Sequence, residues 1–543
     1  MGTPYRGHGQ VGIIKMNEGY EAADLQSVEH ERLIEQRRLD SQLSRELRNE
    51  AGQFATPPAL ADDIAKAVAR FCEFEQIRFL EPAVGTGAFF AALLRNFRHQ
   101  NISLAIGVEL NAASAESAKR LWGAKGLSVI NHDFTAIEIK NRDKEREVNL
   151  ILTNPPYVRH HHLGKDEKLR LQKLASQVVG RDVSGLSGLY TYFVLAAHQW
   201  LADEGLGAWL IPSEFMDVNY GEALRRYFSR HVSLVQIHRF DPSDVQFADA
   251  LVSSAVVIYR RRVPEENHTF LLSHGGTVSD PHHRVDMSLS RLTANHKWSR
   301  LFVDESGEPS EAENPLSALF RITRGIATGA NEFFIMRRQE LATRGIDERF
   351  VKPILPPARL LDGSIIETDA SGFPLVKEQL VVIDTDLNLD EIKKSCIGLW
   401  KYLQKGEQDH TTEAYLLTKR VPWYRQEQRP PAPFLCTYMG RTKADGRTFR
   451  FFWNRSKAIA ANTYLLLYPI GSLKAALDQD PTLCHRVLEI LTELKSEGFT
   501  NHGRVYGGGL FKIEPKELGR VDASAIVKAL NLRVPTQAKL MAM

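Results

Sequence analysis

The sequence predicts an α/β fold, with a mostly parallel, doubly wound sheet in the first half of the chain and a mixed α+β domain in the second. Between residues 54 and 259, short apolar runs alternate with helical patterns, which is typical of crossover units whose sheet is covered on both faces. From about residue 315 this alternation is lost, and Pro and aromatic residues cluster instead. The length of 543 residues leaves room for about two to four domains.

The apolar runs are expected to be strands, because each is short and a helical pattern separates most of them from the next. These runs are Ile77–Leu80, Leu104–Val108, Leu127–Ile130, Val148–Leu152, Leu206–Ile211, Leu234–Ile237 and Val252–Tyr259.

The charge-dense stretch from Glu21 to Glu50 predicts an amphipathic helix that packs against its own domain. A helix that binds a partner protein is the alternative. The apolar residues at helical spacing in this stretch are Leu25, Val28, Leu39, Leu43 and Leu47.

Changes in composition along the chain predict the domain boundaries. The polar, His-rich stretch 260–300 indicates a connection between two domains. We therefore expect a helical extension over residues 1–50, an α/β domain over 51–265, a linker over 266–314 and a second domain over 315–543.

The composition is that of an ordinary globular protein, with 43% hydrophobic and 25% charged residues. It excludes collagen-like, wholly disordered and disulfide-framework proteins. The four Cys residues lack CxxC spacing, which disfavours a zinc ribbon and indicates a reducing compartment. No apolar run reaches 18 residues, and the polar N-terminus does not look like a signal peptide, so a cytoplasmic location is expected. The net charge of +3 gives, by itself, a weak indication against a nucleic-acid partner.

A glycine turn between the first strand and the next helix is the first candidate site. Glu81 ends the strand, and Gly85 and Gly87 allow a tight turn that a ligand can approach closely. Position 90 is Phe, where a dinucleotide fingerprint has a third glycine, so a pyrophosphate is disfavoured.

The next two strand ends also carry acids. Glu109 is placed to bind both hydroxyls of a ribose. Asp133 could accept a hydrogen bond from an adenine amino group, and Phe134 could lie against the ring. Together with Glu81, these acids favour a cofactor with a positive centre over one with phosphates. Each acid by itself could instead cap the helix that follows it.

Asn154, Pro155, Pro156 and Tyr157 directly follow the fourth strand. The prolines fix φ and end the hydrogen-bond ladder, so the Pro155 carbonyl stays free to accept, with the Asn154 side-chain oxygen beside it. Two neutral acceptors held together match the two N–H bonds of a planar amine. Tyr157 offers a flat face for the ring that carries this amine.

The order of these motifs resembles the gamma class of S-adenosylmethionine-dependent N6-adenine DNA methyltransferases, the Taq-type and Eco57-type enzymes of restriction-modification systems. Gln53–Ala61 (QFATPPALA) resembles the motif of this class that closes over the methionine part of the cofactor. Further stretches similar to the family are Gly205–Ser213 with Leu224 and Arg225, Val245–Tyr259, Arg324–Phe334 and Tyr506–Leu518. Val84 departs from the family, which often has Cys in the glycine loop.

The resemblance implies a Rossmann-like methyltransferase domain followed by a target-recognition domain. It implies S-adenosylmethionine as cofactor, no metal, and methyl transfer to the N6 amino group of an adenine flipped out of double-stranded DNA. The implied catalytic residues are Asn154, Pro155, Pro156, Tyr157 and Phe247, with Phe247 as a second aromatic wall around the base. The implied cofactor-binding residues are Phe54, Thr56, Glu81, Ala83, Gly85, Gly87, Glu109, Leu110, Asp133, Phe134 and Asn154. A monomer is expected, with a cognate restriction endonuclease as a separate chain and no membrane partner.

A basic segment between Lys419 and Lys457 changes the meaning of the near-neutral total charge. Ten Lys and Arg residues stand there against Glu427 and Asp445, interleaved with aromatic residues. This mixture favours contacts with phosphates and bases, although a solvated basic face is the alternative. The expected DNA-binding residues are Lys419, Arg420, Arg425, Arg441, Lys443, Arg447, Arg450 and Arg455.

Other functions are less well supported by the sequence. The adjacent residues His160, His161 and His162 cannot all converge on one metal ion from a regular helix or strand, so surface or phosphate contacts are expected. The segment Asp384–Lys394 lacks a convincing nuclease pattern. Two alternatives stay open: a methyltransferase acting on an RNA base, and a non-catalytic DNA-binding specificity subunit.

Overall fold

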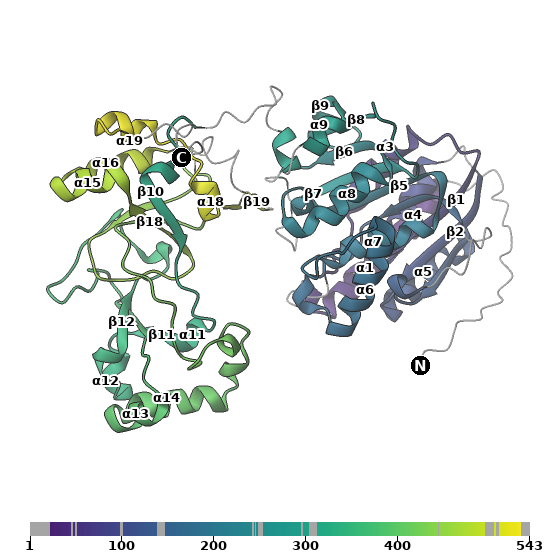
Figure 1. Ribbon diagram of the computed structural model, residues 1–543. Helices are drawn as coiled ribbons and strands as arrows, with labels where there is room; N and C mark the ends of the chain where they lie inside the picture. The colour runs from purple at the N-terminus through teal and green to yellow at the C-terminus, as the bar shows by residue number, and fades with distance from the viewer. Residues whose placement is uncertain are drawn as a thin grey trace. The chain divides into compact units, whose positions relative to one another are not determined.

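The computed structural model describes residues 22–44, 47–48, 52–97, 101–137, 147–241, 244, 246–247, 253–294, 297–302, 312–443, 445–494, 504–506 and 510–533. The chain divides into two compact units, Met1–Gly307 and Glu308–Met543, which are coloured purple to teal and teal to yellow in Figure 1.

The first unit is built on a nine-stranded sheet with the order β3-β2-β1-β4-β5-β7-β6-β8-β9. Strands β1 to β5 run parallel, and β7 lies antiparallel between β5 and β6. All seven expected strands are present. The nine strands are β1 Gln76–Glu81, β2 Asn101–Glu109, β3 Leu127–Asn131, β4 Val148–Thr153, β5 Leu201–Pro212, β6 Ser233–Arg239, β7 Ser254–Arg260, β8 Thr269–Gly276 and β9 Pro281–Ser288.

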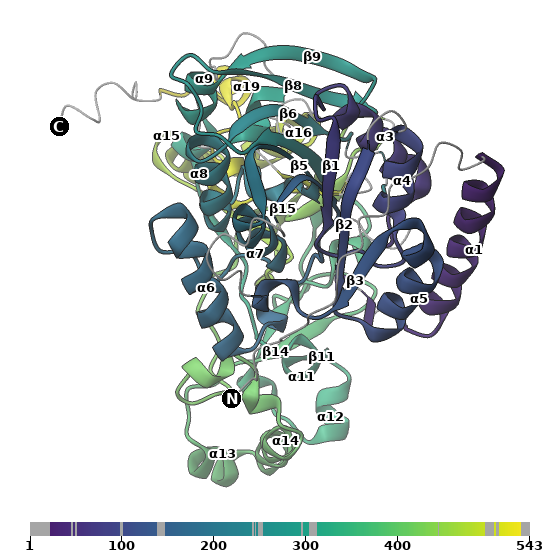
Figure 2. The ribbon, with the colours of Figure 1, turned by 90° about the vertical axis from the view of Figure 1, so that its right-hand side faces the viewer.

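Helices cover both faces of this sheet, as the apolar central strands require. Figure 2 shows α3, α4 and α5 on one side, with α1 outside them, and α6, α7 and α8 on the other. The α-helices are α1 Ala22–Ser41, α3 Pro58–Ala69, α4 Ala88–Asn96, α5 Ala112–Trp122, α6 Lys165–Val179, α7 Leu189–Ala196, α8 Glu222–Arg230 and α9 Leu289–Ala294. Short 3-10 helices lie at Gly123–Lys125, Phe134–Ala136, His160–His162, Ala197–Gln199, Ser213–Met216, Asn219–Gly221 and Trp298–Phe302.

The N-terminal helix is shorter than the charge pattern suggested. α1 ends at Ser41, and Leu43 and Leu47 beyond it are exposed. Leu25 lies in the core of the first unit, and α1 contacts α5, so the helix packs against its own domain.

The expected linker over residues 266–314 is wrong for 269–302. Strand β8 pairs with β6, β9 pairs with β8, and α9 and the 3-10 helix at Trp298–Phe302 follow. Met287, Leu292 and Trp298 join the core of the first unit. The segment looked like a connection because β9 is an edge strand, and most of its residues face solvent.

The second unit has a five-stranded sheet, β10-β18-β15-β17-β13, and two three-stranded sheets, β11-β14-β12 and β16-β20-β19. Its strands are β10 Phe320–Arg324, β11 Ile335–Arg337, β12 Val351–Ile354, β13 Ile365–Ile366, β14 Leu380–Ile383, β15 Phe434–Thr437, β16 Met439–Arg441, β17 Phe451–Asn454, β18 Tyr464–Pro469, β19 Arg504–Tyr506 and β20 Leu510–Lys512. Its α-helices are α10 Leu316–Leu319, α11 Asn331–Phe334, α12 Glu340–Arg344, α13 Leu389–Ser395, α14 Ile397–Gln408, α15 Gly471–Gln479, α16 Leu483–Glu493, α18 Pro515–Leu518 and α19 Ser524–Ala529. Its 3-10 helices lie at Glu348–Phe350, Ala358–Leu360, Thr411–Glu413 and Leu417–Lys419. The unit is therefore a mixed α+β domain, as expected.

Within the described residues, no helix is long and apolar enough to cross a membrane.

Candidate functional site

The loop between β1 and α4 is shaped by two glycines in the left-handed region. Gly85 has φ 54° and Gly87 has φ 93°, and α4 begins directly after Gly87. A Cβ on Gly87 would lie 2.4 Å from Nε1 of Trp122, so only glycine fits there. A Cβ on Gly85 would meet nothing within 4 Å, which leaves open space beside the loop for a ligand.

Glu81 lies buried at the foot of this loop. Its carboxylate accepts a hydrogen bond of 3.2 Å from the backbone N–H of Phe90 in α4. Burial raises the pKa of Glu81 well above its usual range, although the N–H groups of Phe90 and Phe89 and the nearby Arg32 act in the opposite direction. A positive ligand group beside this carboxyl would favour its ionised form.

Glu109 ties the end of β2 to the same loop. Its two carboxylate oxygens accept hydrogen bonds from the N–H of Gly85 at 2.9 Å and of Asn111 at 2.8 Å. Burial raises the pKa of Glu109, and the hydrogen bonds partly offset this. The neighbouring Leu110 is 73% exposed and offers an apolar face next to the loop.

Asp133 and Phe134 differ from the expectation in part. One oxygen of Asp133 caps the 3-10 helix by accepting from Thr135, and the other accepts from Arg170 of α6 at 2.9 Å. Phe134 is only 2% exposed and packs against Phe193 and Trp200. Phe134 is therefore a core residue, and its ring offers no free face for an adenine.

Asn154 is held by the segment that precedes α3. Its Nδ2 donates to the Phe54 carbonyl at 3.0 Å and to the Thr56 hydroxyl at 3.2 Å. Its Oδ1 is buried and has no hydrogen-bond partner among the described residues. The structure thus brings Phe54, Thr56 and Asn154 together and leaves one buried acceptor unused.

Aromatic rings gather beside Asn154. The rings of Phe54, Tyr157 and Phe247 lie with centroids 5.7 to 6.0 Å apart. Tyr157 is anchored by a hydrogen bond of 3.1 Å from its hydroxyl to the Leu210 carbonyl. The planes of Tyr157 and Phe247 are at 87°, so both cannot lie flat against one base unless Phe247 turns.

The sequence did not point to several residues of this site. Tyr190 lies 6.4 Å from Tyr157 between ring centroids, and its buried hydroxyl has no hydrogen-bond partner among the described residues. Arg170 and Arg32 reach Asp133 and the glycine loop from helices distant in sequence. The sequence held only two signals for these residues. Tyr190 lies in the apolar run of α7, and each arginine lies in a mostly solvated helix.

The eight expected DNA-binding residues fall into three groups. Arg420 donates to the backbone carbonyls of Ala327 and Thr328. Arg450 donates to the backbone carbonyls of Ala358, Leu361 and Gly363. Both arginines therefore stabilise the second unit. Three others form ion pairs: Arg425 with Asp386, Arg447 with Asp445 and Arg455 with Glu367. Lys419, Arg441 and Lys443 are exposed and form no ion pair within 4.0 Å among the described residues, although Lys443, after Arg447, helps to lower the pKa of Asp445 through its charge.

The three adjacent histidines form a 3-10 helix at the protein surface, directly after the Asn154–Tyr157 segment. His161 and His162 contact each other, with ring centroids 4.1 Å apart. Within the described part of the chain, no group of three or more His, Cys, Asp or Glu side chains could hold a metal ion. Parts of two stretches that resemble a known family, residues 245, 248–252 and 507–509, lie outside the described residues.

Models of known protein families match both halves of the chain. The Eco57I restriction-modification methylase model matches residues 91–246, and the model of the type II methyltransferase M.Eco57I C-terminal domain matches residues 299–540. Type II methyltransferase M.AccI of Acinetobacter calcoaceticus is 25% identical over 492 residues, covering 88% of this chain and 86% of that protein. Type II methyltransferase M.XamI of Xanthomonas campestris pv. amaranthicola is 28% identical over 460 residues, covering 82% and 80%.

Among solved structures, the type IIG restriction endonuclease BpuSI is similar with a TM-score of 0.44 and 13% identity, over 90% of this chain and 62% of that one. Along the chain, the methylase model matches first and the C-terminal-domain model second, which is also the order of the α/β unit and the mixed unit. The chain belongs to the Eco57I-type restriction-modification methylases, the gamma class of these methyltransferases.

Proposed function

We propose that this protein transfers a methyl group from S-adenosylmethionine to the N6 amino group of an adenine flipped out of double-stranded DNA. It would thereby act as the modification component of a restriction-modification system. The observation that carries the proposal is the unused, buried Oδ1 of Asn154 beside an aromatic wall. Most buried polar atoms have a hydrogen-bond partner in the protein or in an ordered water, so an unused acceptor at the end of a strand is suited to a ligand.

The strand ends fit the proposed cofactor. The buried Glu81 and the half-buried Glu109 suit a cationic ligand better than a phosphate, and Leu110 offers an apolar face. We assign the cofactor to Glu81, Ala83, Gly85, Gly87, Glu109, Leu110 and Asp133, together with the Phe54–Thr56 segment and Asn154. S-adenosylmethionine supplies an electrophilic methyl group attached to a sulfonium.

Asn154 and Pro155 would activate the acceptor nitrogen. An exocyclic adenine nitrogen is a poor nucleophile because its lone pair is delocalised into the ring. When the Asn154 Oδ1 and the Pro155 carbonyl accept its two N–H bonds, a pyramidal nitrogen with a directed lone pair is favoured. The acceptors need not be strong bases, because the nitrogen loses its proton only after methylation makes it acidic.

Base flipping follows from the burial of these acceptors. A base inside a duplex cannot reach Asn154, and extrusion costs a few kcal/mol. Tyr157 is itself only 8% exposed and packs against Phe54 and Phe247, so a base stacks on it only after these rings part; such stacking would offset about 1–3 kcal/mol of the cost. Phe247 could add a second contact only after a change of its ring orientation.

The second unit would bind the DNA, with Lys419, Arg441 and Lys443 as the phosphate contacts. We expect a DNA-associated protein of the cytoplasm that acts as a monomer, with a cognate endonuclease as a separate chain.

The decisive experiment supplies the purified protein with S-adenosylmethionine labelled in its methyl group and with DNA or RNA. We expect label in double-stranded DNA only, and base-resolved sequencing should locate methyladenine at one short sequence. Label in RNA, or in cytosine, would contradict the proposal. Cofactor binding without any transfer to DNA would favour the non-catalytic specificity subunit.

A further inference from the structure

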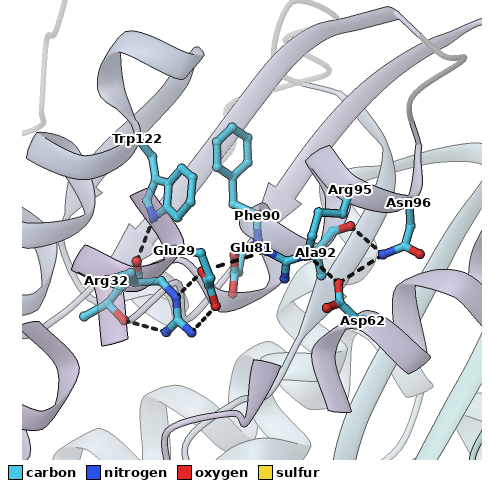
Figure 3. A network of polar contacts seen from close by, with 10 residues as sticks. Glu29, Arg32, Asp62, Glu81, Phe90, Ala92, Arg95, Asn96 and Trp122 are labelled. Carbon is cyan, nitrogen blue, oxygen red and sulfur yellow. Dashed lines mark hydrogen bonds and ion pairs between the residues drawn. The ribbon is translucent and has the colours of Figure 1, made fainter. Parts of the chain in front are cut away.

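One face of α1 carries a buried charge close to the glycine loop. Arg32 is only 1% exposed, and its Nε and Nη2 donate to the carboxylate of Glu29 at 2.8 and 2.7 Å. Its Nη1 donates to the hydroxyl of Thr86 at 3.1 Å. Figure 3 shows this arginine between Glu29 and the loop, with Glu81 nearby.

Thr86 is the residue between the two glycines of the loop, and contacts hold it from three directions. Besides accepting from Arg32, its hydroxyl donates to Gln36 of α1 at 2.7 Å. Its carbonyl accepts from Nε1 of Trp122 in α5 at 2.8 Å. Thr86 is 2% exposed, so its side chain faces α1 and not the open space beside Gly85.

These contacts matter because the loop has little conformational preference of its own. Glycine loses more backbone freedom on folding than any other residue, so a loop with glycine on both sides of Thr86 must be fixed by its neighbours. Fixing Thr86 also fixes the N–H of Gly85, which donates to Glu109.

Stability alone does not explain a buried arginine. Well-packed apolar residues often replace a buried ion pair without loss of stability. The same helix contains a matched pair that lacks the loop contact: Arg38 donates to Glu35 at 2.9 and 2.7 Å, but its side chain is 53% exposed. Among the described contacts, only the Arg32 pair extends to the glycine loop.

We propose that Arg32 and Gln36 are positioning residues for cofactor binding: through Thr86 they hold the glycine loop in the conformation that accepts the cofactor. The N-terminal helix is then part of the cofactor site although it does not touch the cofactor. This inference rests on the proposed function, which names S-adenosylmethionine as the cofactor.

The test compares four variants of the full chain by equilibrium dialysis against S-adenosylmethionine in the absence of DNA. Arg32→Met and Thr86→Val should raise the dissociation constant at least about tenfold. Thr86→Ser keeps the hydroxyl and should restore affinity to within about threefold of the wild type. Arg38→Met removes the matched surface pair and should leave affinity unchanged.

Two further measurements separate positioning from damage to the fold. Thermal unfolding without cofactor should give similar midpoints for Thr86→Val and Thr86→Ser, while the increase in midpoint caused by a fixed cofactor concentration should be smaller in Thr86→Val than in Thr86→Ser. At saturating cofactor, Arg32→Met should reach nearly the wild-type kcat, with the loss appearing in KM for the cofactor.

The outcomes are distinct. If the wild type binds the cofactor and Arg32→Met and Thr86→Val bind it equally well, this inference is overturned and the proposed function stands. Equal weakening in Thr86→Val and Thr86→Ser would also overturn it, because the hydroxyl would then be irrelevant. If the wild type binds no S-adenosylmethionine, the proposed function fails, and this inference fails with it.

Discussion

The amide of Asn154 can take only one orientation, because the Phe54 carbonyl oxygen accepts hydrogen bonds and cannot donate them. The NH₂ group must face Phe54 and Thr56, which leaves Oδ1 for a ligand. We expect Asn154→Ala to retain binding of cofactor and DNA but to lose methyl transfer by about 10²- to 10³-fold, comparable with removal of one preorganised polar group elsewhere. Single-turnover methylation with pre-bound substrates measures this loss.

A control for Asn154 is Thr56→Val, which removes one of the two hydrogen bonds and keeps the Phe54 carbonyl. A loss clearly smaller than that of Asn154→Ala is expected, because the amide keeps its orientation. Near-normal turnover of Asn154→Ala would exclude the proposed activation of the amino group.

Tyr157 should contribute through its ring and not through its hydroxyl. We expect Tyr157→Ala to lower kcat/KM about 5- to 150-fold for a paired adenine, following from about 1–3 kcal/mol of stacking. The loss should be smaller for an adenine opposite an abasic site, where extrusion costs less. Tyr157→Phe keeps the ring and removes only the bond to the Leu210 carbonyl, so it is the matched control. Equal losses of Tyr157→Ala on both substrates would show that stacking does not serve extrusion.

The sequence was sufficient to place residues at the end of a strand or directly after it, and insufficient to place those whose position depends on packing. Glu81, Glu109 and Asn154 could be predicted because the carboxyl ends of parallel strands meet at one edge of the sheet. The burial of Phe134 and the pairing of Asp133 with Arg170 depend on how α6 and α7 pack on that edge. No pattern within the sequence reports such a contact.

At the scale of elements, the pair β6 and β8 contains a histidine that should make it sensitive to acid. His238 of β6 is fully buried, its Nδ1 lies 3.1 Å from the hydroxyl of Ser273 in β8, and burial lowers its pKa to about 4. Asp63 acts in the opposite direction, whereas His274 and His282 reinforce the lowering. The neutral ring is therefore the form that the sheet accommodates.

The sign of the effect follows from proton linkage. Below about pH 6.5 the unfolded chain binds a proton at His238 that the folded chain does not bind until about pH 4. Stability should therefore fall as the pH drops from 6.5 to 4, by on the order of 3 kcal/mol for a shift of this size. Hydrogen exchange of the β6 and β8 amides, corrected for intrinsic rates, measures the fall.

His238→Asn provides the comparison, because its amide can still bond to Ser273 but does not titrate. It should be less stable at pH 7, and its stability should depend less on pH between 6.5 and 4. The same pH dependence in both proteins would assign the acid sensitivity to other groups.

Strand prediction missed β8 and β9, which lie in the polar stretch taken for a linker. Each of the seven predicted strands, including the edge strand β3, contains at least three apolar residues within a short run. β9 lies at the sheet edge with a mostly exposed middle, and it showed no apolar run. Its pairing with β8 depends on the polar backbone, which every residue carries.

At the scale of the whole molecule, the near-neutral total of +3 does not describe what DNA would meet. The basic segment 419–457 was predicted from charge density, but density does not tell which cations are available. Arg420 and Arg450 are used by backbone carbonyls, and four other arginines, Arg425, Arg429, Arg447 and Arg455, are paired with acids. The exposed Lys419, Arg441 and Lys443 should therefore account for most phosphate contacts of the segment.

This distribution predicts the salt dependence of DNA binding. The logarithm of the DNA-binding constant falls linearly with the logarithm of the salt concentration, and each lost phosphate contact makes this slope shallower by about 0.9. Replacing Lys419, Arg441 and Lys443 with Gln should therefore make the slope shallower by about two to three and weaken binding to all DNA sequences alike. Replacing the exposed Lys394, Lys401 and Lys528 changes the net charge equally outside the segment and should leave the slope nearly unchanged. Fluorescence anisotropy at several salt concentrations measures both, and equal slopes in the two triple variants would move the DNA-binding surface away from residues 419–457.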